Sequence, residues 1–538
     1  MYVTAYAPYG ADGIILRVEA DLRRGIPGID ITGLAEGAVK EARERVMAAF
    51  RNSGYIFPQD RILINLAPAG VRKHGAYLDL PIALAVMAAA KLIPATENLM
   101  VLGELELSGR LRPVRGVLAA TAAGLREGIN EFIIPKENAP EAAILAPGRF
   151  AGVENLTEAV QALITRANTG SLPAQSLGDS VQKDKAPPGD GDFGDLRGQG
   201  RYKRALEIAA AGGHNLLVFG PPGAGKTMLA RRLPSIMPPL TASEAVEVTR
   251  LYSLAEQLQD SLIEGPPFRS PHHSASLEGI LGGGKNVKPG EISLAHLGVL
   301  FLDEAPEFKS NVLQSLREPL EDRVITISRA EGPVLLPADF QLLLAANSCP
   351  CGRLGIPHPA GGTIDNIPLT GDARTLNSFA AAGGCFCSSE EIYRHWRKFG
   401  GALLDRIELR IPVQSTSPAQ MSQEKKEETS ETISRRVRQA VEIQRERFKE
   451  TKVRRNARMP PGLLDQYCRL SPEAEQTFSS AAGKLGLSGR AFHGVLRVAR
   501  TIADLEGKDP ILPVHILEAI QHRRLGDDPY DILTCPQT

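Results

Sequence analysis

The sequence predicts an α/β fold class, with two α/β units in succession and a helical segment after them. Three observations support this prediction. Over residues 1–165, short apolar runs alternate with helical patterns, as they do in α/β and α+β domains. At residues 215–227 an apolar run breaks into a glycine-rich loop, and such a loop requires a parallel sheet around it. Residues 431–525 then have helical periodicity.

The first unit is expected over residues 1–168. Its strand-like runs are Arg61–Leu66, Leu99–Leu102 and Glu131–Ile134, and its helical patterns are Glu36–Phe50, Leu80–Lys91 and Gly116–Arg126. A flexible linker is expected over 169–194, because 171–194 are rich in Ser, Pro, Gly and charge with almost nothing to bury. The second unit is expected over 195–413, a polar connector over 414–430 and the helical segment over 431–530.

Size and composition indicate a globular protein of about two to four domains. The 62 Lys and Arg balance the 62 Asp and Glu, so a basic surface for nucleic acid would have to be local. The start of the chain lacks the order of a signal peptide. The best apolar stretch, Leu80–Pro94, is too short to span a membrane and carries Lys91. With six cysteines and no secretion signal, we expect a cytoplasmic protein without a disulfide framework.

The glycine-rich loop predicts a site for a triphosphate and Mg²⁺. It consists of Gly220, Pro221, Pro222, Gly223, Ala224, Gly225, Lys226 and Thr227. Glycine-rich backbone can bring N–H groups against phosphates without Cβ clashes. Lys226 would reach the β- and γ-phosphates, and the Thr227 hydroxyl would ligate Mg²⁺. The alternative is an ordinary turn, but the helix-like run Met228–Leu233 follows directly, which is the context a phosphate loop needs.

Two further strands are expected to end in catalytic side chains. Val299–Leu302 precedes Asp303 and Glu304. Asp303 would hold Mg²⁺ through water, and Glu304 would orient and polarise the attacking water. The strand Gln341–Ala346 ends at Asn347, whose amide would sense the terminal phosphate. The alternatives are a strand that meets a turn and an Asn that caps one.

In this order, and followed by a helical segment, these motifs resemble those of AAA+ ATPases. Longer strings narrow the resemblance to the magnesium-chelatase-like ComM/YifB family. These strings are Arg197–Gln199, Ala205–Asn215, Phe268–His273, Pro289–His296, Arg317–Glu321, Leu403–Arg406 and Arg497–Asp504. The resemblance implies an AAA+ P-loop NTPase module with a C-terminal helical lid. It also implies that the protein forms a ring of six subunits and is driven by ATP with Mg²⁺.

The resemblance also assigns two arginines. Arg406 would be the arginine finger, which spreads positive charge over the transition state in the neighbouring subunit. A finger acting in trans makes the active site shared between subunits. The alternative is a surface arginine paired with Asp405. Arg490 matches the lid arginine of the family and would contact the γ-phosphate of its own subunit.

Two segments are candidates to line a central channel. Arg323–Leu336 fits the β-hairpin that related proteins insert before the sensor strand, and Gly282–Lys285 is a glycine-rich loop. The alternative for both is a surface turn. His272 and His273 lie in a family string, and for them we expect structural hydrogen bonds rather than metal ligation.

Two C-x-C pairs predict a metal site or a group of free thiols. They are Cys349 with Cys351 and Cys385 with Cys387. Four thiolates can close a tetrahedral structural Zn²⁺ site and hold a long loop, here Gly352–Gly384. The alternative is four free reduced thiols. The remaining cysteines, Cys468 and Cys535, are single and are expected to be incidental.

The first unit resembles the peptidase domain of Lon proteases, a ribosomal S5 domain 2-like α/β fold. The resemblance rests on Leu102–Val117 and Ile133–Asn138. Peptide cleavage there needs a serine nucleophile and a lysine base. Where the serine is expected, Lys73–Asp79 contain no Ser or Thr, and there is no Lys near Gly116–Leu118. We therefore expect a catalytically dead scaffold.

The leading expectation is an ATP-driven motor on DNA. ComM-type relatives imply branch migration or unwinding in recombination or in uptake of transforming DNA. Between Arg435 and Arg458 ten Lys and Arg face three acids, and these could contact DNA phosphates or form a solvated helix face. Aromatic residues are only 5% of the chain, so stacking is not expected to be the main binding mode. The rivals are a chelatase-type motor for metal insertion into a porphyrin, an active Lon-type protease and a protein remodeller that does not bind DNA.

Overall fold

The fold is described from a computed structural model. The described residues are 2–8, 13–33, 37–69, 73, 77–94, 97–173, 191–258, 262–284, 287–328, 333–354, 385–414 and 427–523. Among them, no helix combines the length and the apolar character that a membrane span requires. Most of the loop Gly352–Gly384, the tip of the hairpin Arg323–Leu336, and Lys285, His74 and Cys535 lie outside these ranges.

The first unit is a mixed seven-stranded sheet with helices. The strand order is β3-β4-β2-β1-β5-β8-β9. The strands are β1 (Tyr2–Ala7), β2 (Ile14–Arg23), β3 (Gly28–Thr32), β4 (Arg61–Ala67), β5 (Leu99–Val101), β8 (Glu131–Pro135) and β9 (Phe150–Val153), with a small hairpin of β6 (Glu104–Leu105) and β7 (Leu111–Arg112). The helices are α1 (Gly37–Asn52), α2 (Asp79–Ala89), α3 (Val117–Arg126), α4 (Ala139–Leu145) and α5 (Leu156–Thr169). The three strands and three helices predicted for this unit are confirmed.

Helix α2 is the centre of this unit. Every residue from Asp79 to Ala88 is buried, and the helix contacts α1, β1 and β2. A helix that is apolar on all sides must be buried on all sides. Residues Leu80–Ala88 of the apolar stretch Leu80–Pro94 are therefore core, whereas Lys91 and Leu92 after the helix are exposed.

The second unit contains a five-stranded parallel sheet. Its order is β11-β14-β17-β10-β18, and all four neighbouring pairs are parallel. The strands are β11 (Phe268–Arg269), β14 (Val299–Leu302), β17 (Gln341–Ala346), β10 (Leu216–Phe219) and β18 (Leu409–Pro412). Every residue of β10, β14 and β17 is buried, which is why these strands are continuous apolar runs rather than alternating ones.

Helices and two hairpins surround this sheet. The helices are α6 (Gly200–Gly212), α7 (Lys226–Ala230), α8 (Ala242–Leu254), α9 (Leu277–Leu281), α10 (Glu291–Leu294), α11 (Ser310–Ser315), α12 (Arg317–Asp322), α14 (Ser389–Arg397) and α15 (Gly401–Leu404). The hairpins pair β12 (Gly282–Gly283) with β13 (Lys288–Pro289), and β15 (Val324–Ile327) with β16 (Val334–Pro337). Both hairpins fall where channel-lining segments were expected. The helix predicted over Met228–Leu233 is shorter, because α7 ends at Ala230 and a 3₁₀ turn begins at Leu233.

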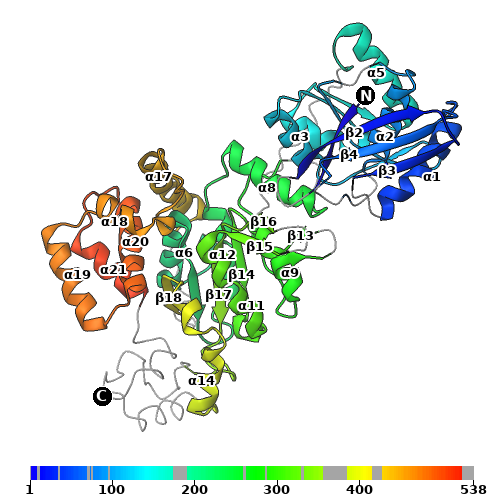
Figure 1. The fold of residues 1–538 in the computed structure, drawn as a ribbon. Coiled ribbons are helices and arrows are strands. Elements are labelled where there is room, and N and C mark those ends of the chain that lie inside the picture. The colour runs from blue at the N-terminus through cyan, green and yellow to red at the C-terminus, as the bar shows by residue number, and fades with distance from the viewer. Residues whose placement is uncertain are drawn as a thin grey trace.

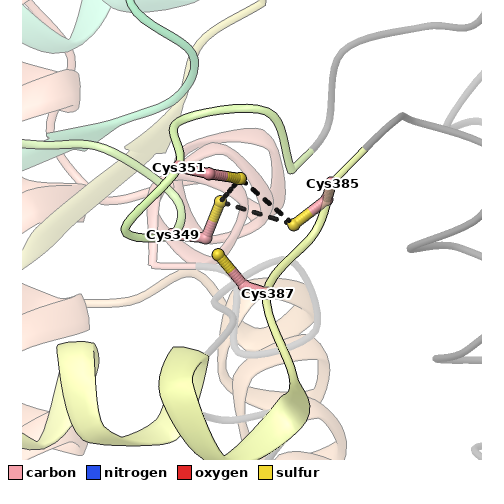
Figure 2. A group of neighbouring side chains, drawn as sticks. All are labelled: Cys349, Cys351, Cys385 and Cys387. Carbon is pink, nitrogen blue, oxygen red and sulfur yellow. Dashed lines mark hydrogen bonds between the residues drawn. The ribbon is translucent and has the colours of Figure 1, made fainter.

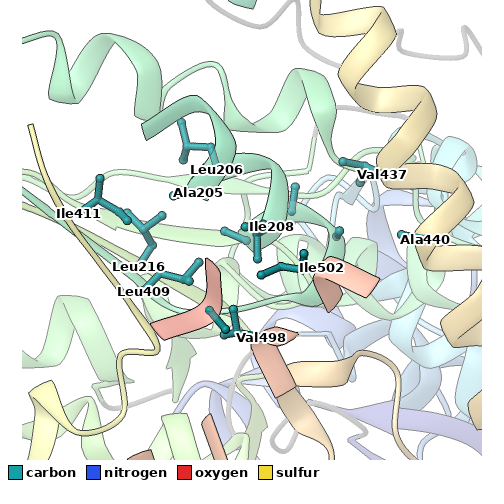
Figure 3. Close-up of a cluster of buried hydrophobic side chains, with 14 of the residues drawn as sticks. Ala205, Leu206, Ile208, Leu216, Leu409, Ile411, Val437, Ala440, Val498 and Ile502 are labelled. Carbon is teal, nitrogen blue, oxygen red and sulfur yellow. The ribbon is translucent and has the colours of Figure 1, made fainter. Parts of the chain in front are cut away.

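The C-terminal helices share a core with the parallel sheet. They are α17 (Ser430–Phe448), α18 (Pro461–Tyr467), α19 (Pro472–Leu485), α20 (Gly489–Leu505) and α21 (Pro513–His522). One continuous cluster contains Leu216 and Ile411 of the sheet, Ile208 of α6, Val437 of α17 and Ile502 of α20 (Figure 3). These helices are thus packed onto the sheet module through α6, although the sequence suggested a separate final segment.

Both ends of the expected linker are packed. Leu172 lies in the core of the first unit and Phe193 in the core of the second, each less than 5% exposed. Asp192 caps the 3₁₀ turn Phe193–Asp195 and accepts hydrogen bonds from the backbone of Ser430. The expectation that 171–194 bury almost nothing is therefore wrong at both ends, because single apolar residues within a polar stretch carry no periodic signal. Residues 174–190 lie outside the described ranges.

The two units meet at α8 (Figure 1). Leu254, at the end of α8, packs in one cluster with Tyr6 and Val117 of the first unit. The Ser253 hydroxyl donates to Glu141 at 2.6 Å, and Arg115 pairs with Glu256 at 2.9 Å. The contact is thus a small apolar centre with polar pairs around it, and α8 belongs to the unit that carries the phosphate loop.

Candidate functional site

The phosphate loop leaves the sheet at the carboxyl end of β10. The Gly220 N–H donates to the Ala346 carbonyl at 3.2 Å, which joins the loop to the end of β17. A Cβ atom on Gly220 would lie 2.2 Å from the Val413 carbonyl oxygen, so only glycine fits there. The loop ends where α7 begins at Lys226, and the N–H groups at a helix start are suited to bind phosphate.

Lys226 is held inside this loop. Its ammonium group donates to the carbonyls of Gly220 and Pro221, each at 2.8 Å, and to Asn347 Oδ1 at 3.1 Å. Burial lowers the pKa of Lys226 to about 8, opposed by the charges of Asp303 and Glu304. The structure thus brings the loop lysine together with the amide predicted to sense the terminal phosphate.

The predicted Mg²⁺ ligands also lie together. Thr227 Oγ1 donates to Asp303 Oδ2 at 2.8 Å, and the Glu304 N–H donates to Asp303 Oδ1 at 3.0 Å. A hydroxyl and a carboxylate are oxygen ligands of the kind that Mg²⁺ prefers, so these residues fit the ion. Glu304 has a positive φ of 49°, and 60% of its side chain is exposed. It is therefore free to contact a water molecule beside the phosphates.

A cleft beside the loop was not anticipated from the sequence. Its volume is about 300 Å³, and it is lined by Asp195, Leu196, Arg197, Gln199, Gly223, Ala224, Gly225, Met228 and Leu229. Gln199 Nε2 donates to the Ala224 carbonyl at 3.1 Å, which fixes one wall. The cleft adjoins the phosphate loop and is suited to the base and sugar of a nucleotide. The string Arg197–Gln199 was a signal for it, although no role could be assigned to those residues from the sequence.

The two histidines of the string Phe268–His273 lie beside Glu304. His273 Nδ1 is 3.9 Å from Glu304 Oε2. The His272 and His273 rings are 4.0 Å apart, and His272 Nδ1 lies 2.8 Å from Ser274 Oγ. His272 thus has the structural contact expected of it, whereas His273 faces the predicted catalytic carboxylate. His273 and Glu304 are far apart in the sequence, so their proximity could not be predicted from it. They lie together because β11 and β14 are neighbours in the sheet.

Arg406 and Arg490 do not lie at the phosphate loop of their own chain. The Arg406 carbonyl accepts from Asn215 Nδ2 at 3.0 Å, just before β10 begins, whereas the phosphate loop follows the end of β10. A strand of four residues spans roughly 13 Å, so the two sites lie at opposite edges of the sheet. Both arginines bind Glu321, and Arg490 does so at 3.1 Å.

The placement of Arg406 suits the predicted finger in trans. It does not suit the expectation that Arg490 contacts the phosphate of its own subunit, because Arg490 shares a carboxylate with the finger. Asp405, the alternative partner of Arg406, lies near Ser488 and Arg523 instead. Within one chain, Arg406 and Arg490 thus lie together at Glu321, away from the phosphate loop.

The four predicted cysteines form one cluster (Figure 2). Their sulfur atoms all lie within 4.8 Å of one another. Cys349 Sγ is 3.4 Å from Cys351 Sγ and 3.6 Å from Cys385 Sγ, and Cys351 and Cys385 are 3.5 Å apart. Zn–S bonds of about 2.3 Å place the sulfurs of a tetrahedral site about 3.8 Å apart. The four thiols therefore fit a zinc ion.

This cluster adjoins the nucleotide site. The Asn347 carbonyl lies 3.0 Å from His395 Nε2, and the Ser348 carbonyl accepts from Trp396 Nε1 at 3.0 Å. A Cβ atom on Gly352 would lie 2.9 Å from Pro222 of the phosphate loop. The cysteine cluster and α14 thus hold the strand end that presents Asn347 to Lys226.

The basic stretch Arg435–Arg458 is mostly paired within the chain. Seven of its ten basic residues form ion pairs: Arg435, Arg436, Arg445, Arg447, Lys449, Arg454 and Arg458. Arg447 binds Asp504, which is fully buried, and Arg458 binds Asp339. Arg447 and Arg458 are therefore structural, whereas the exposed pairs of Arg435 and Lys449 are weak surface contacts.

The first unit contains two buried charged groups near the expected position of the Lon serine. Lys73 donates to the carbonyls of Gly33, Leu66 and Pro68, and burial lowers its pKa. All three ammonium hydrogens therefore have acceptors, as in a structural group rather than a free base. Asp79 pairs with Arg45 at 2.6 Å.

A phosphate loop after one strand of a parallel sheet, with carboxylates after another, is the architecture of P-loop NTPases. Three family models match the chain. "Magnesium chelatase, subunit ChlI" matches residues 192–364, "Subunit ChlI of Mg-chelatase" matches 18–138, and "Magnesium chelatase, subunit ChlI C-terminal" matches 427–523.

Relatives match over nearly the whole chain. The sequence is 39% identical to YifB of Salmonella typhimurium over 525 residues, 96% of each chain. It is 38% identical to competence protein ComM of Haemophilus influenzae over 531 residues, 97% of each chain. Over 183 residues it is 30% identical to Lon protease of Salinispora arenicola, covering 32% of this chain and 24% of that one. The chain belongs to the ComM/YifB family of magnesium-chelatase-like AAA+ proteins.

Proposed function

We propose that this protein is an ATP-driven motor that acts on DNA, in helicase or branch-migration steps of recombination or natural transformation. It hydrolyses Mg²⁺-ATP between neighbouring copies of a six-membered ring in the cytoplasm. One observation carries the ATPase part. Lys226 binds Asn347 while Thr227 binds Asp303, so the groups needed to hold a Mg²⁺-triphosphate converge on one loop. The AAA+ family, to which the chain belongs, supports the same activity.

In this mechanism the chain's own groups position the nucleotide. Lys226 and the loop N–H groups bind the phosphates, and the cleft at Gln199 binds the base and sugar. Thr227 and Asp303 would hold Mg²⁺, which would supply positive charge to offset the negative charge developing on the phosphates. Glu304 orients the attacking water, and Asn347 contacts the terminal phosphate. Arg406 and Arg490, from the opposite edge of the sheet, complete the site of the neighbouring subunit.

DNA as the partner is supported by the competence protein ComM of Haemophilus influenzae, whose name associates it with competence. A magnesium-chelatase-type motor and a protein remodeller without DNA activity are the alternative functions. The chelatase family models favour the first of these. We propose no protease activity, because Lys73 has three carbonyl acceptors and the segment Lys73–Asp79 contains no Ser or Thr.

A structural zinc ion belongs to the same proposal. Cys349, Cys351, Cys385 and Cys387 would hold it, with a role in rigidity rather than in catalysis. Because the cluster adjoins Asn347 and Pro222, such a zinc site would fix the sensor side of the nucleotide site.

ATP turnover separates these functions in one assay. Wild type and Lys226→Ala are assayed with forked DNA, single-stranded DNA, a porphyrin or casein, and DNA strand displacement is followed in parallel. We expect DNA to stimulate turnover in wild type only, with strand displacement that needs ATP. Stimulation by porphyrin or casein alone supports the corresponding alternative. If no DNA binds at low salt or stimulates turnover, the DNA assignment fails.

A further inference from the structure

Two side chains beside the cysteine cluster are exposed and in contact. Phe386, between Cys385 and Cys387, is 79% exposed. Arg353, two residues after Cys351, is exposed as well, and its guanidinium carbon lies 5.1 Å from the centre of the Phe386 ring. Phenylalanine is among the residues most often buried, so its position at this surface needs a cause.

The C-x-C spacing explains why Phe386 is exposed. Successive side chains of an extended segment point to opposite sides. When both cysteines of a pair turn toward the cluster, the residue between them must turn away. Pro350, between Cys349 and Cys351, is also exposed, although that pair lies in a turn closed by the Gly352 N–H and the Cys349 carbonyl. Cys349 and Cys385 are both buried, so Phe386 cannot turn inward without breaking the cluster.

We propose that Phe386 and Arg353, here the Phe386 platform, stack against a base of single-stranded DNA. An exposed aromatic face with an adjacent guanidinium is the combination that stacks bases without sequence preference. The guanidinium also offers a charge to the phosphate backbone. This inference rests on the proposed DNA function and names a contact site for it. The low aromatic content does not oppose it, because a single well-placed ring suffices for one base.

Two described acidic residues that follow Phe386 in the chain already have partners. Glu390 binds Arg394 at 2.9 Å, and Glu391 accepts hydrogen bonds from the backbone N–H and hydroxyl of Ser388 at the start of α14. Neither of these acids forms an ion pair with Arg353 within the described part of the chain, so its charge is offered to a strand. Both acids belong to the first turn of α14, where they favour the helix N-terminus.

The platform is also placed to influence ATP turnover. Gly352, directly before Arg353, lies against Pro222 of the phosphate loop. On the other side of the cluster, Cys349 follows Asn347 by two residues, and Asn347 binds Lys226. A strand bound at the platform would thus steady the segment that presents the sensor amide. We expect single-stranded DNA to stimulate turnover through this segment.

The test measures DNA affinity and turnover in the full-length protein. Binding of a fluorescein-labelled oligo-dT is followed by anisotropy at low salt, for wild type, Phe386→Ala, Phe386→Trp and Arg353→Ala. Loss of one stacked base weakens binding about fivefold or more. We expect this for Phe386→Ala, with wild-type affinity for Phe386→Trp and intermediate affinity for Arg353→Ala. Tyr393→Ala, which removes a partly exposed aromatic from α14, is the matched control and should bind as wild type does.

Zinc content and unstimulated turnover accompany each measurement. Both should be unchanged in Phe386→Ala, while DNA stimulation is reduced. If Phe386→Ala loses zinc, the DNA affinities of Phe386→Trp and Phe386→Leu are compared in its place. Phe386→Leu keeps an apolar side chain without a ring, so the difference between the two reports the contribution of the ring. If Phe386→Ala, or Phe386→Leu where it is used, binds DNA as tightly as wild type, the proposed stacking at the Phe386 platform is wrong. The proposal of a DNA motor is not affected by that result. Absence of DNA binding by wild type overturns both.

Discussion

Arg406 and Arg490 bind the same carboxylate, that of Glu321, although they are 84 residues apart in the chain. Both lie at the edge of the sheet where the strands begin, and the phosphate loop lies at the edge where they end. In this arrangement neither arginine reaches the phosphate loop of its own chain. Adjacent copies in a ring would bring the two edges together.

Replacing Arg406 with Ala should remove turnover while nucleotide binding persists. An arginine finger contributes about 10³-fold or more to turnover, because it neutralises charge that develops only in the transition state. Steady-state ATPase assays and binding of a fluorescent nucleotide measure the two effects. Arg406→Ala with wild-type turnover contradicts the assigned role.

Mixing variants tests whether Arg490 also acts across the interface. Lys226→Ala removes the loop function, and Arg490→Ala removes the arginine from the other edge. If the two act in neighbouring subunits, mixed rings contain some intact sites and recover part of the turnover that each variant lacks. A mixture as inactive as its components would show that Arg490 serves its own subunit. Mixing Lys226→Ala with Arg406→Ala provides the comparison for a finger.

Nucleotide affinity should fall as the pH rises above about 8. Burial lowers the pKa of Lys226 to about 8 in the free protein, and bound phosphates favour the charged form and raise it. Nucleotide binding is then strongest below pH 8, where Lys226 is already charged. Above pH 8, nucleotide binding requires that Lys226 take up a proton. Calorimetry at pH 7 and pH 9 in two buffers of different ionisation enthalpy detects this uptake. If affinity is constant between pH 7 and pH 9 and no proton is taken up, Lys226 does not titrate on nucleotide binding. Lys226→Arg is measured as the control.

Gly352→Ala should weaken ATP binding and spare the zinc site. Gly352 has a φ of 74°, and its Cβ position lies 2.9 Å from Pro222. A left-handed conformation costs a residue with a side chain about 1–2 kcal/mol, and the added methyl group presses on the phosphate loop. Nucleotide titration and metal analysis are the measurements. Gly462→Ala, at a position with nothing within 4 Å of the Cβ, should change neither quantity.

Asp504→Ala should destabilise the C-terminal helices. Asp504 is fully buried and binds Arg447 at 2.5 Å, Arg500 at 3.0 Å and Asn456 at 2.8 Å. Removing it leaves two guanidinium groups without their buried partner, which costs about 3–5 kcal/mol. Urea unfolding followed by circular dichroism measures the loss. Glu446→Ala removes the exposed pair with Lys449 and should change stability little. A comparable effect of both variants would refute the buried network.

Metal analysis tests the zinc site directly. Purified protein should contain about one zinc per chain, and Cys351→Ser or Cys385→Ser should lose it, because a structural zinc site needs four ligands. Cys468→Ser should keep the metal, since Cys468 lies in another cluster. Wild type without zinc after preparation in zinc-containing medium would favour four free thiols.

The sequence by itself determined the units with the strongest local patterns. Glycine at 220 and 225, the apolar strands β10, β14 and β17 and the paired cysteines each have a signal within a few residues, because backbone geometry and burial act locally on them. The two C-x-C pairs led to the expectation of a four-cysteine site, and the four sulfur atoms do lie together; zinc and the triphosphate remain predictions.

Only the tertiary structure decided which distant residues meet. His273 reaches Glu304 because β11 and β14 are neighbours. Arg490 joins Arg406 rather than Lys226 because the C-terminal helices pack onto α6, and Arg447 turns inward to Asp504. Charge along a sequence does not reveal its partners. Packing of apolar faces selects them, since it fixes which edges of the sheet and which helices come within the few ångströms over which these contacts form.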